Sequence, residues 1–335
     1  MRRRNLLTGA MALGATAALG TSSAEAAEGT VEDTLFRLPS APPVPLARLT
    51  QEIMKARADF RAAHYTVLGQ SLARLLAAAT ATRDAATGHE RERANIALAR
   101  GYVLAAELAL KQHDDSAWVA ADRALTAARA SGHPVPIGES SRVLAITMRR
   151  PGRIPAAVQF LGHEAKNLDT LRPQTGAVRT TLMLTAAYTA ANGGDRTTAL
   201  DLLNAAEEET DRWAAQPNPE LFTVDANKAQ VDVYRIGAHT ALGTPDEAVE
   251  VAARLDIDRM PTAERRARAW TDTARMWHAL GDDRQTFAAL RHVEQEAPQE
   301  VRRPAVRALT SDLLYGPTRV PGIREFAGRT GASFA

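Results

Sequence analysis

The stretch that decides the fold is ARAWTDTARMWHALGDDRQTFAALRHVEQEAP, residues 267–298. It predicts two helices joined by a short turn, because small and apolar residues recur every three or four positions on both sides of Gly281. Trp270 and Trp277 lie seven residues apart, two turns along one helix face, and small Ala274 between them lets a second helix approach. We therefore predict a packed helix pair whose tryptophans belong to the core and do not form a ligand cage.

The order and spacing of these residues resemble the tetratricopeptide repeat, a helix pair of about 34 residues. The resemblance is carried by Trp270, Thr273, Ala274, Trp277, Gly281, Asp282, Leu290 and Pro298. Turns recur about every 35 to 50 residues, which is the range of helix-pair repeats. They stand at residues 112–114, 151–153, 193–195, 243–245, 281–283 and 316–317. The resemblance implies an all-α fold, a right-handed superhelical solenoid of roughly six to seven tetratricopeptide-like helix pairs with a concave inner wall.

Composition and motifs exclude several classes of function. The formal net charge is +2, and without the three arginines and one glutamate of residues 1–26 the chain is neutral, so we expect no direct nucleic acid binding. The chain has no cysteine, which excludes disulfides and thiolate metal sites. It contains no Gly-Lys dipeptide and therefore no Walker A loop, and its histidines lack metal-site spacing. We predict no cofactor, no metal and no catalytic residue, that is, a protein that is not an enzyme.

The N-terminus has the layout of a secretory signal peptide. Arg2-Arg3-Arg4 precedes an apolar run from Leu6 to Gly20, and Ala24-Glu25-Ala26 fits a signal peptidase site. The pair Arg3-Arg4 also resembles the twin-arginine export motif. The run is too short and too rich in glycine and alanine to span a membrane, so we predict no stable membrane anchor. Residues 1–26 are thus either an export signal or a joining segment that stays attached.

Two further segments complete the predicted organisation. Residues 27–45 include the run Pro-Ser-Ala-Pro-Pro-Val-Pro and are predicted to form a Pro-rich linker. Residues 46–330 are predicted to form the helical repeat domain.

The candidate binding residues follow from the resemblance to tetratricopeptide repeats, in which the first helix of each pair lines the concave wall. On that helix, the side chains beside the small and aromatic core positions are then expected to face the concave groove. This offset from the core positions selects Tyr102, Glu139, Arg142, Arg149, Tyr188, Gln230, Arg268, Arg275 and His278. Five of the nine can carry positive charge and one is acidic, and guanidinium groups match carboxylates bidentately. We therefore predict a protein or peptide partner bound through acidic side chains or its C-terminal carboxylate. The alternative is that these arginines pair with carboxylates of neighbouring helices.

A second resemblance is carried by four stretches: Leu38-Pro39 with Pro42-Pro43-Val44-Pro45, Ala58–Ala62, Ala117–Ala124 and Arg302–Val306. They are similar to the helical-repeat regulatory half of actinobacterial Xre-type transcriptional regulators, over about residues 32–328. Nothing before the repeats has the length of the helix-turn-helix that binds DNA in that family. The resemblance implies a cytoplasmic regulatory or sensor module that binds a ligand or pairs subunits as a homodimer.

Two functions follow from these observations. The first is a non-enzymatic regulatory or sensor protein, related to transcriptional regulators, that binds a protein or peptide in the groove of a helical-repeat solenoid. The alternative is a scaffold or adaptor exported through the twin-arginine pathway, cleaved near Ala26, that mediates protein assembly.

Overall fold

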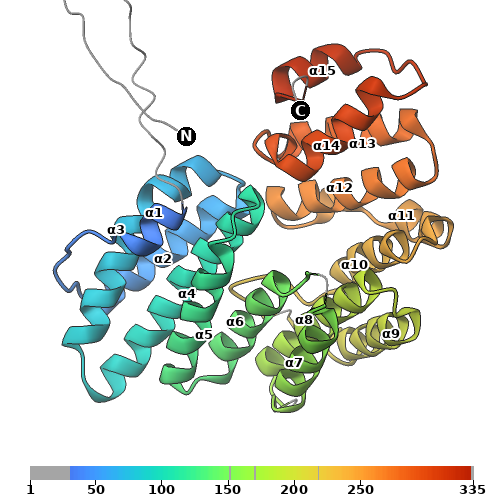
Figure 1. Cartoon of the computed structure of the whole chain (residues 1–335). Coiled ribbons are helices and arrows are strands. Elements are labelled where there is room, and N and C mark those ends of the chain that lie inside the picture. The colour runs from blue at the N-terminus through green and yellow to red at the C-terminus, as the bar shows by residue number, and fades with distance from the viewer. Residues whose placement is uncertain (1–30, 151, 170, 218, 333–335) are drawn as a thin grey trace, which may run out of the picture.

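The computed structural model describes residues 31–332 except for residues 151, 170 and 218 (Figure 1). Every regular element among these described residues is a helix, which confirms the all-α prediction. The α-helices are α1 (Val31–Phe36), α2 (Leu46–Arg61), α3 (Tyr65–Ala85), α4 (Gly88–Gln112), α5 (Ala117–Ser131), α6 (Pro134–Thr147), α7 (Ile154–Lys166), α8 (Pro173–Asn192), α9 (Arg196–Arg212), α10 (Lys228–Ala241), α11 (Val249–Arg254), α12 (Ala263–Ala279), α13 (Asp283–Glu296), α14 (Pro304–Tyr315) and α15 (Ile323–Thr330). Three short 3-10 helices are η1 (Pro245–Ala248), η2 (Ile257–Arg259) and η3 (Glu300–Arg302).

The helices make two kinds of neighbour contact. Consecutive helices pack in pairs, α4 with α5, α8 with α9 and α12 with α13 among them. Alternate helices also contact one another in succession, in the order α2, α4, α6, α8, α10 and α12, and α12 in turn contacts α2. Figure 1 shows these six labels following one another around the molecule. We call these six the inner helices; their row closes on itself.

The closing contact belongs to a continuous apolar core. The largest cluster of buried residues contains Leu76 and Leu104 from the N-terminal helices together with Leu290 and Phe326 from the C-terminal ones. All four are fully buried, and burying a leucine or phenylalanine side chain stabilises a fold by roughly 1.5–3 kcal/mol. The N-terminal and C-terminal helices of the described residues thus share one apolar core.

The stretch that suggested the fold forms α12 and α13. Gly281 takes a φ of 77° at the turn between them, a left-handed conformation that glycine adopts without steric cost. Asp282 caps the N-terminus of α13, and its side chain accepts a hydrogen bond from the Gln285 amide at 2.9 Å. Ala274 is fully buried, whereas Trp270 and Trp277 are half-buried and pack against neighbouring clusters.

The predicted linker differs from the structure at one place. Within residues 27–45 the short helix α1 packs against α3, α4 and α5. Its Val31 and Leu35 lie four residues apart, so that both face the core and are buried, and Arg123 donates to the Leu35 carbonyl at 2.7 Å. The Pro-rich residues 38–45 that follow are without helix.

The signal-like or joining segment, residues 1–26, lies outside the described residues. Within the part of the chain that the structure describes, no helix is both long and apolar enough to cross a membrane.

Candidate functional site

A cavity of about 170 Å³ lies among the inner helices, and each of the six contributes side chains to its wall. We call it the central cavity. Six of its lining residues are basic and three are acidic. The basic ones are Lys111, Arg142, Arg149, Arg265, Arg268 and Arg303, and the acidic ones are Glu107, Glu264 and Asp272. Gln230 and several apolar and aromatic side chains complete the wall.

The structure brings five of the nine predicted groove residues together at this cavity. They are Arg142, Arg149, Tyr188, Gln230 and Arg268. The other four, Tyr102, Glu139, Arg275 and His278, are not part of its lining.

Tyr102 and Glu139 are buried away from the cavity. The Tyr102 ring lies 5.9 Å from the guanidinium carbon of Arg123, toward α5. The Glu139 carboxylate accepts backbone hydrogen bonds from Phe222 at 2.5 Å and Thr223 at 3.4 Å. Burial raises the pKa of Glu139, although nearby arginines and these two amides oppose the shift. Both bonds go to Oε1, whereas Oε2 is buried without a hydrogen-bond partner.

Arg275 and His278 lie on the C-terminal half of α12. Arg275 donates to Asp272 at 3.2 Å, and Nε2 of His278 is 3.7 Å from Asp312. Both side chains are about one-third exposed, and each has a carboxylate of the protein beside it. For these two residues the arrangement matches the alternative prediction of pairing with the protein's own carboxylates.

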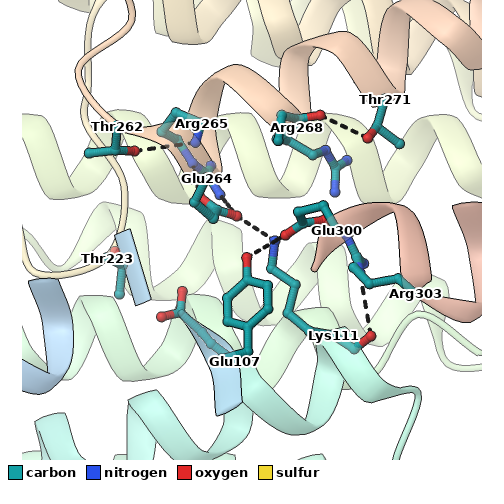
Figure 2. A network of polar contacts seen from close by, with 12 residues as sticks. Glu107, Lys111, Thr223, Thr262, Glu264, Arg265, Arg268, Thr271, Glu300 and Arg303 are labelled. Atoms are coloured by element: carbon teal, nitrogen blue, oxygen red, sulfur yellow. Dashed lines mark hydrogen bonds and ion pairs between the residues drawn. The ribbon is translucent and has the colours of Figure 1, made fainter. Parts of the chain in front are cut away.

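One wall of the central cavity is a buried ionic network that joins distant parts of the chain (Figure 2). Nζ of Lys111, at the end of α4, lies 2.5 Å from carboxylate oxygens of both Glu264 and Glu300. Glu300 also accepts from the Tyr65 hydroxyl and, at 2.6 Å, from Arg303. Although burial favours the protonated carboxyl, Lys111 and Arg303 lower the pKa of Glu300 to about 2. The network therefore holds an ionised carboxylate in the interior.

Two arginines of α12 are neutralised by carboxylates of the same helix. Arg265 donates to both carboxylate oxygens of Glu264, at 2.5 and 2.6 Å. Arg268 donates to Asp272 at 2.7 Å. Paired guanidinium groups of this kind shape the cavity wall but contribute little net charge to it.

Arg142 and Arg149 differ from these, because neither donates a hydrogen bond to a carboxylate of the described residues. Arg142 is buried and donates through Nη2 to the Tyr234 hydroxyl at 3.0 Å. Arg149 follows the C-terminus of α6 and donates to the Thr189 hydroxyl at 2.9 Å and the Thr185 carbonyl at 3.3 Å. Burial lowers the pKa of Arg149 to about 10.

Two tyrosines stand beside these arginines. The rings of Tyr188 and Tyr234 meet edge to face with centroids 6.2 Å apart, and the Arg149 guanidinium carbon lies 4.8 Å from the centre of the Tyr188 ring. Gly237 allows this arrangement, because a Cβ there would lie 2.8 Å from the Tyr188 ring. Although burial opposes it, Arg142 and Arg149 lower the pKa of Tyr234 to about 7.

Residues 220–223, which we call the inner segment, fill the space next to the cavity. They belong to the connection between α9 and α10 and form no helix. Arg57 donates to the Thr223 carbonyl, and Arg61 donates to the Leu221 carbonyl at 2.7 Å. The guanidinium carbons of Arg57 and Arg100 lie 5.2 and 5.0 Å from the centre of the Phe222 ring. The part of the interior around Glu139 is therefore occupied by the protein's own backbone.

Sequence reasoning did not identify several residues of this site, among them Lys111, Tyr234, Arg265 and Arg303. A signal was available for two of them. Tyr234 lies four positions after the predicted Gln230, and Arg265 lies three positions before the predicted Arg268, so each shares a helix face with a residue already selected. Lys111 is one of four lysines in the chain, but nothing local indicates its partners.

Comparison with known proteins gives no match: no protein-family profile matches the chain, and no curated protein or solved structure is significantly similar to it. The described residues contain no group of three or more His, Cys, Asp or Glu side chains placed to hold a metal ion.

Proposed function

We propose that this protein is a non-enzymatic regulatory or sensor protein that binds a peptide or protein through an anionic group held in the central cavity. In this proposal the helices are tetratricopeptide-like pairs, roughly six to seven in number, forming a right-handed solenoid whose first and last inner helices meet. The observation that carries the proposal is the convergence of Arg142, Arg149 and Arg268 on one cavity.

The charge of the cavity favours an anionic ligand. Its lining has six basic residues against three acidic ones, in a chain that is otherwise nearly neutral. Guanidinium groups in a cavity shielded from water bind carboxylates more strongly than they do at an exposed surface, because the local dielectric constant is lower.

The size of the cavity limits what can enter. A cavity of about 150 Å³ accommodates benzene, so a volume of about 170 Å³ suits one side chain or one chain terminus. We therefore expect one terminal or side-chain group of the partner to enter, while the rest of the partner contacts the rim.

The resemblance to the repeat half of Xre-type regulators supports a regulatory role in the cytoplasm. The Arg3-Arg4 motif supports the alternative, a scaffold exported by the twin-arginine pathway. Mass spectrometry of the mature N-terminus separates the two: cleavage after Ala26 supports export, and an intact start supports the cytoplasmic regulator.

The proposal predicts that Arg268→Ala weakens peptide binding by about tenfold or more, because Asp272 in the cavity wall then loses its partner at 2.7 Å and its negative charge repels an anionic ligand. The measurement is fluorescence titration of the full chain with peptides first selected from a random synthetic peptide array. Arg275→Ala is the matched control, since Arg275 lies on the same helix and bonds the same Asp272 but does not line the cavity. We expect an effect below about twofold for the control. An array without any binding peptide, or equal effects of the two substitutions, would contradict the proposal.

A further inference from the structure

We infer that Arg142, Arg149 and Tyr234 form a binding site for one carboxylate group that carries a small apolar substituent. The inference rests on the proposed function, because it names the chemical group that the central cavity recognises.

The first observation is unused hydrogen-bonding capacity on Arg142. Its side chain is 5% exposed, and its Nε and Nη1 groups are buried without a hydrogen-bond partner. Glu107 is 3.7 Å from Nη1, too far for a hydrogen bond, and its other oxygen accepts from Arg57 at 2.5 Å. A buried donor without a partner destabilises the protein, more so when it is charged, and a bound carboxylate removes this cost.

The second observation concerns Arg149. No carboxylate of the described residues lies within 4.0 Å of its guanidinium group, and its hydrogen bonds to protein use only Nε and Nη2. Arg142 reaches the cavity from α6 and Arg149 from the residues that follow this helix. The Tyr234 hydroxyl, bonded to Arg142, supplies a neutral donor next to them.

The third observation is that each of the remaining cavity cations is already hydrogen-bonded to a carboxylate of the protein. Lys111 bonds Glu264 and Glu300, Arg265 bonds Glu264, Arg268 bonds Asp272, and Arg303 bonds Glu300. Arg142 and Arg149 are therefore the cavity cations whose hydrogen-bonding groups are most available to a ligand.

The apolar residues that line the cavity with Arg142 and Arg149 favour an organic acid over an inorganic anion as the ligand. Ile146 lies between the two arginines in sequence, and Leu110, Val233 and Phe60 also line the cavity. An inorganic anion would leave this apolar surface and much of the volume unfilled, whereas a carboxylate with a small apolar group would cover both. Such a group belongs either to a free small acid or to the C-terminal residue of a peptide.

The test is calorimetric titration of the full chain with benzoate, with neutral benzamide and with inorganic phosphate. We expect benzoate to bind, and benzamide and phosphate to bind at least about tenfold more weakly. Arg149→Ala should weaken benzoate binding by about tenfold or more. Arg150→Ala is the control, because Arg150 is the adjacent residue in sequence but is exposed and bonds Asp115. Equal binding of benzamide, tighter binding of phosphate, or no effect of Arg149→Ala would overturn the inference.

Two further variants keep the test decisive if a substitution prevents the protein from folding. Arg142→Ala is expected to cause the same loss of binding if its circular dichroism spectrum is unchanged. Should Arg142→Ala fail to fold, Tyr234→Phe replaces it, because this substitution removes only the hydroxyl donor. We expect Tyr234→Phe to weaken benzoate binding about three- to tenfold at about pH 6.

Peptide titrations show whether the bound carboxylate belongs to a free small acid or to a peptide C-terminus. They also test the carboxylate site separately from the proposed function. Each array-selected peptide is titrated with a free C-terminal carboxylate and with a C-terminal amide. Benzoate binding without any peptide binding supports the carboxylate site and contradicts the proposed function. Peptide binding that is the same for the acid and the amide, without benzoate binding, contradicts the carboxylate site and leaves the proposed function standing.

Carboxylate binding should also depend on pH through Tyr234. Below about pH 7 the phenol is neutral and can donate to the ligand; above it the phenolate neutralises the arginines and repels a carboxylate. Affinity for benzoate should therefore fall by up to about tenfold per pH unit above 7. The charged and titratable groups around Tyr234 are Arg142, Arg149, Arg265, Arg268 and Tyr188. Tyr234→Phe should abolish this slope, and a slope that persists in the variant would contradict the role given to Tyr234.

Discussion

Glu300→Ala is expected to lower the free energy of unfolding by about 3–5 kcal/mol, the typical cost of removing one partner from a buried ionic network. Glu300 is fully buried and holds Lys111, Arg303 and the Tyr65 hydroxyl together. After its removal Lys111 keeps Glu264, but Arg303 loses its carboxylate. Equilibrium denaturation in urea, followed by circular dichroism, measures the change.

An exposed pair provides the control for this substitution. Glu52 bonds Arg48 at 2.9 Å one helical turn away, and both side chains are largely exposed. Glu52→Ala should cost about 0.5 kcal/mol or less. Because the pKa of Glu300 is lowered from 4.5 to about 2, its stabilising effect should be present above about pH 4.5 and decline as the pH falls toward 2. A loss below about 1 kcal/mol at neutral pH would show that the network does not hold the ends of the chain together.

Arg57→Ala is the second substitution with a large expected effect. Arg57 is 2% exposed, bonds Glu107 and the Thr223 carbonyl, and lies between the rings of Phe60 and Phe222. Its removal leaves a buried carboxylate and a buried carbonyl with fewer partners, so we expect a loss of about 3–4 kcal/mol.

Hydrogen exchange locates this effect on the inner segment, residues 220–223. The amides of Phe222 and Thr223 bond Glu139, and Arg57→Ala should lower their protection well beyond the global loss of stability. Arg61→Ala is the matched control, because Arg61 bonds the same segment but its side chain is 24% exposed. Equal protection in the two variants would contradict the view that Arg57 anchors the segment.

Local pattern was sufficient for most of the secondary structure. The pair predicted around Gly281 appears as α12 and α13. Arg142, Arg149 and Arg268 could be selected because an offset along a helix face is a local property, independent of what the helix packs against. The same offset also selected Arg275, which bonds Asp272 instead of lining the cavity.

The remaining features depend on contacts between residues far apart in sequence. Lys111 and Glu300 are separated by 189 positions, and Arg57 and Thr223 by 166. Neither pairing has a sequence signal, because the partners meet only when the row of inner helices closes. The inner segment was missed for the same reason: it has no helical period, and its backbone is fixed by side chains from α2 and α6.

The most direct test of the carboxylate site is a crystal structure of the full chain with 4-bromobenzoate, whose bromine is located by anomalous scattering. We predict a bromine peak in the central cavity, with the carboxylate about 3 Å from nitrogen atoms of Arg142 and Arg149. An empty cavity at saturating 4-bromobenzoate, with Arg142 instead hydrogen-bonded to Glu107, would contradict the account.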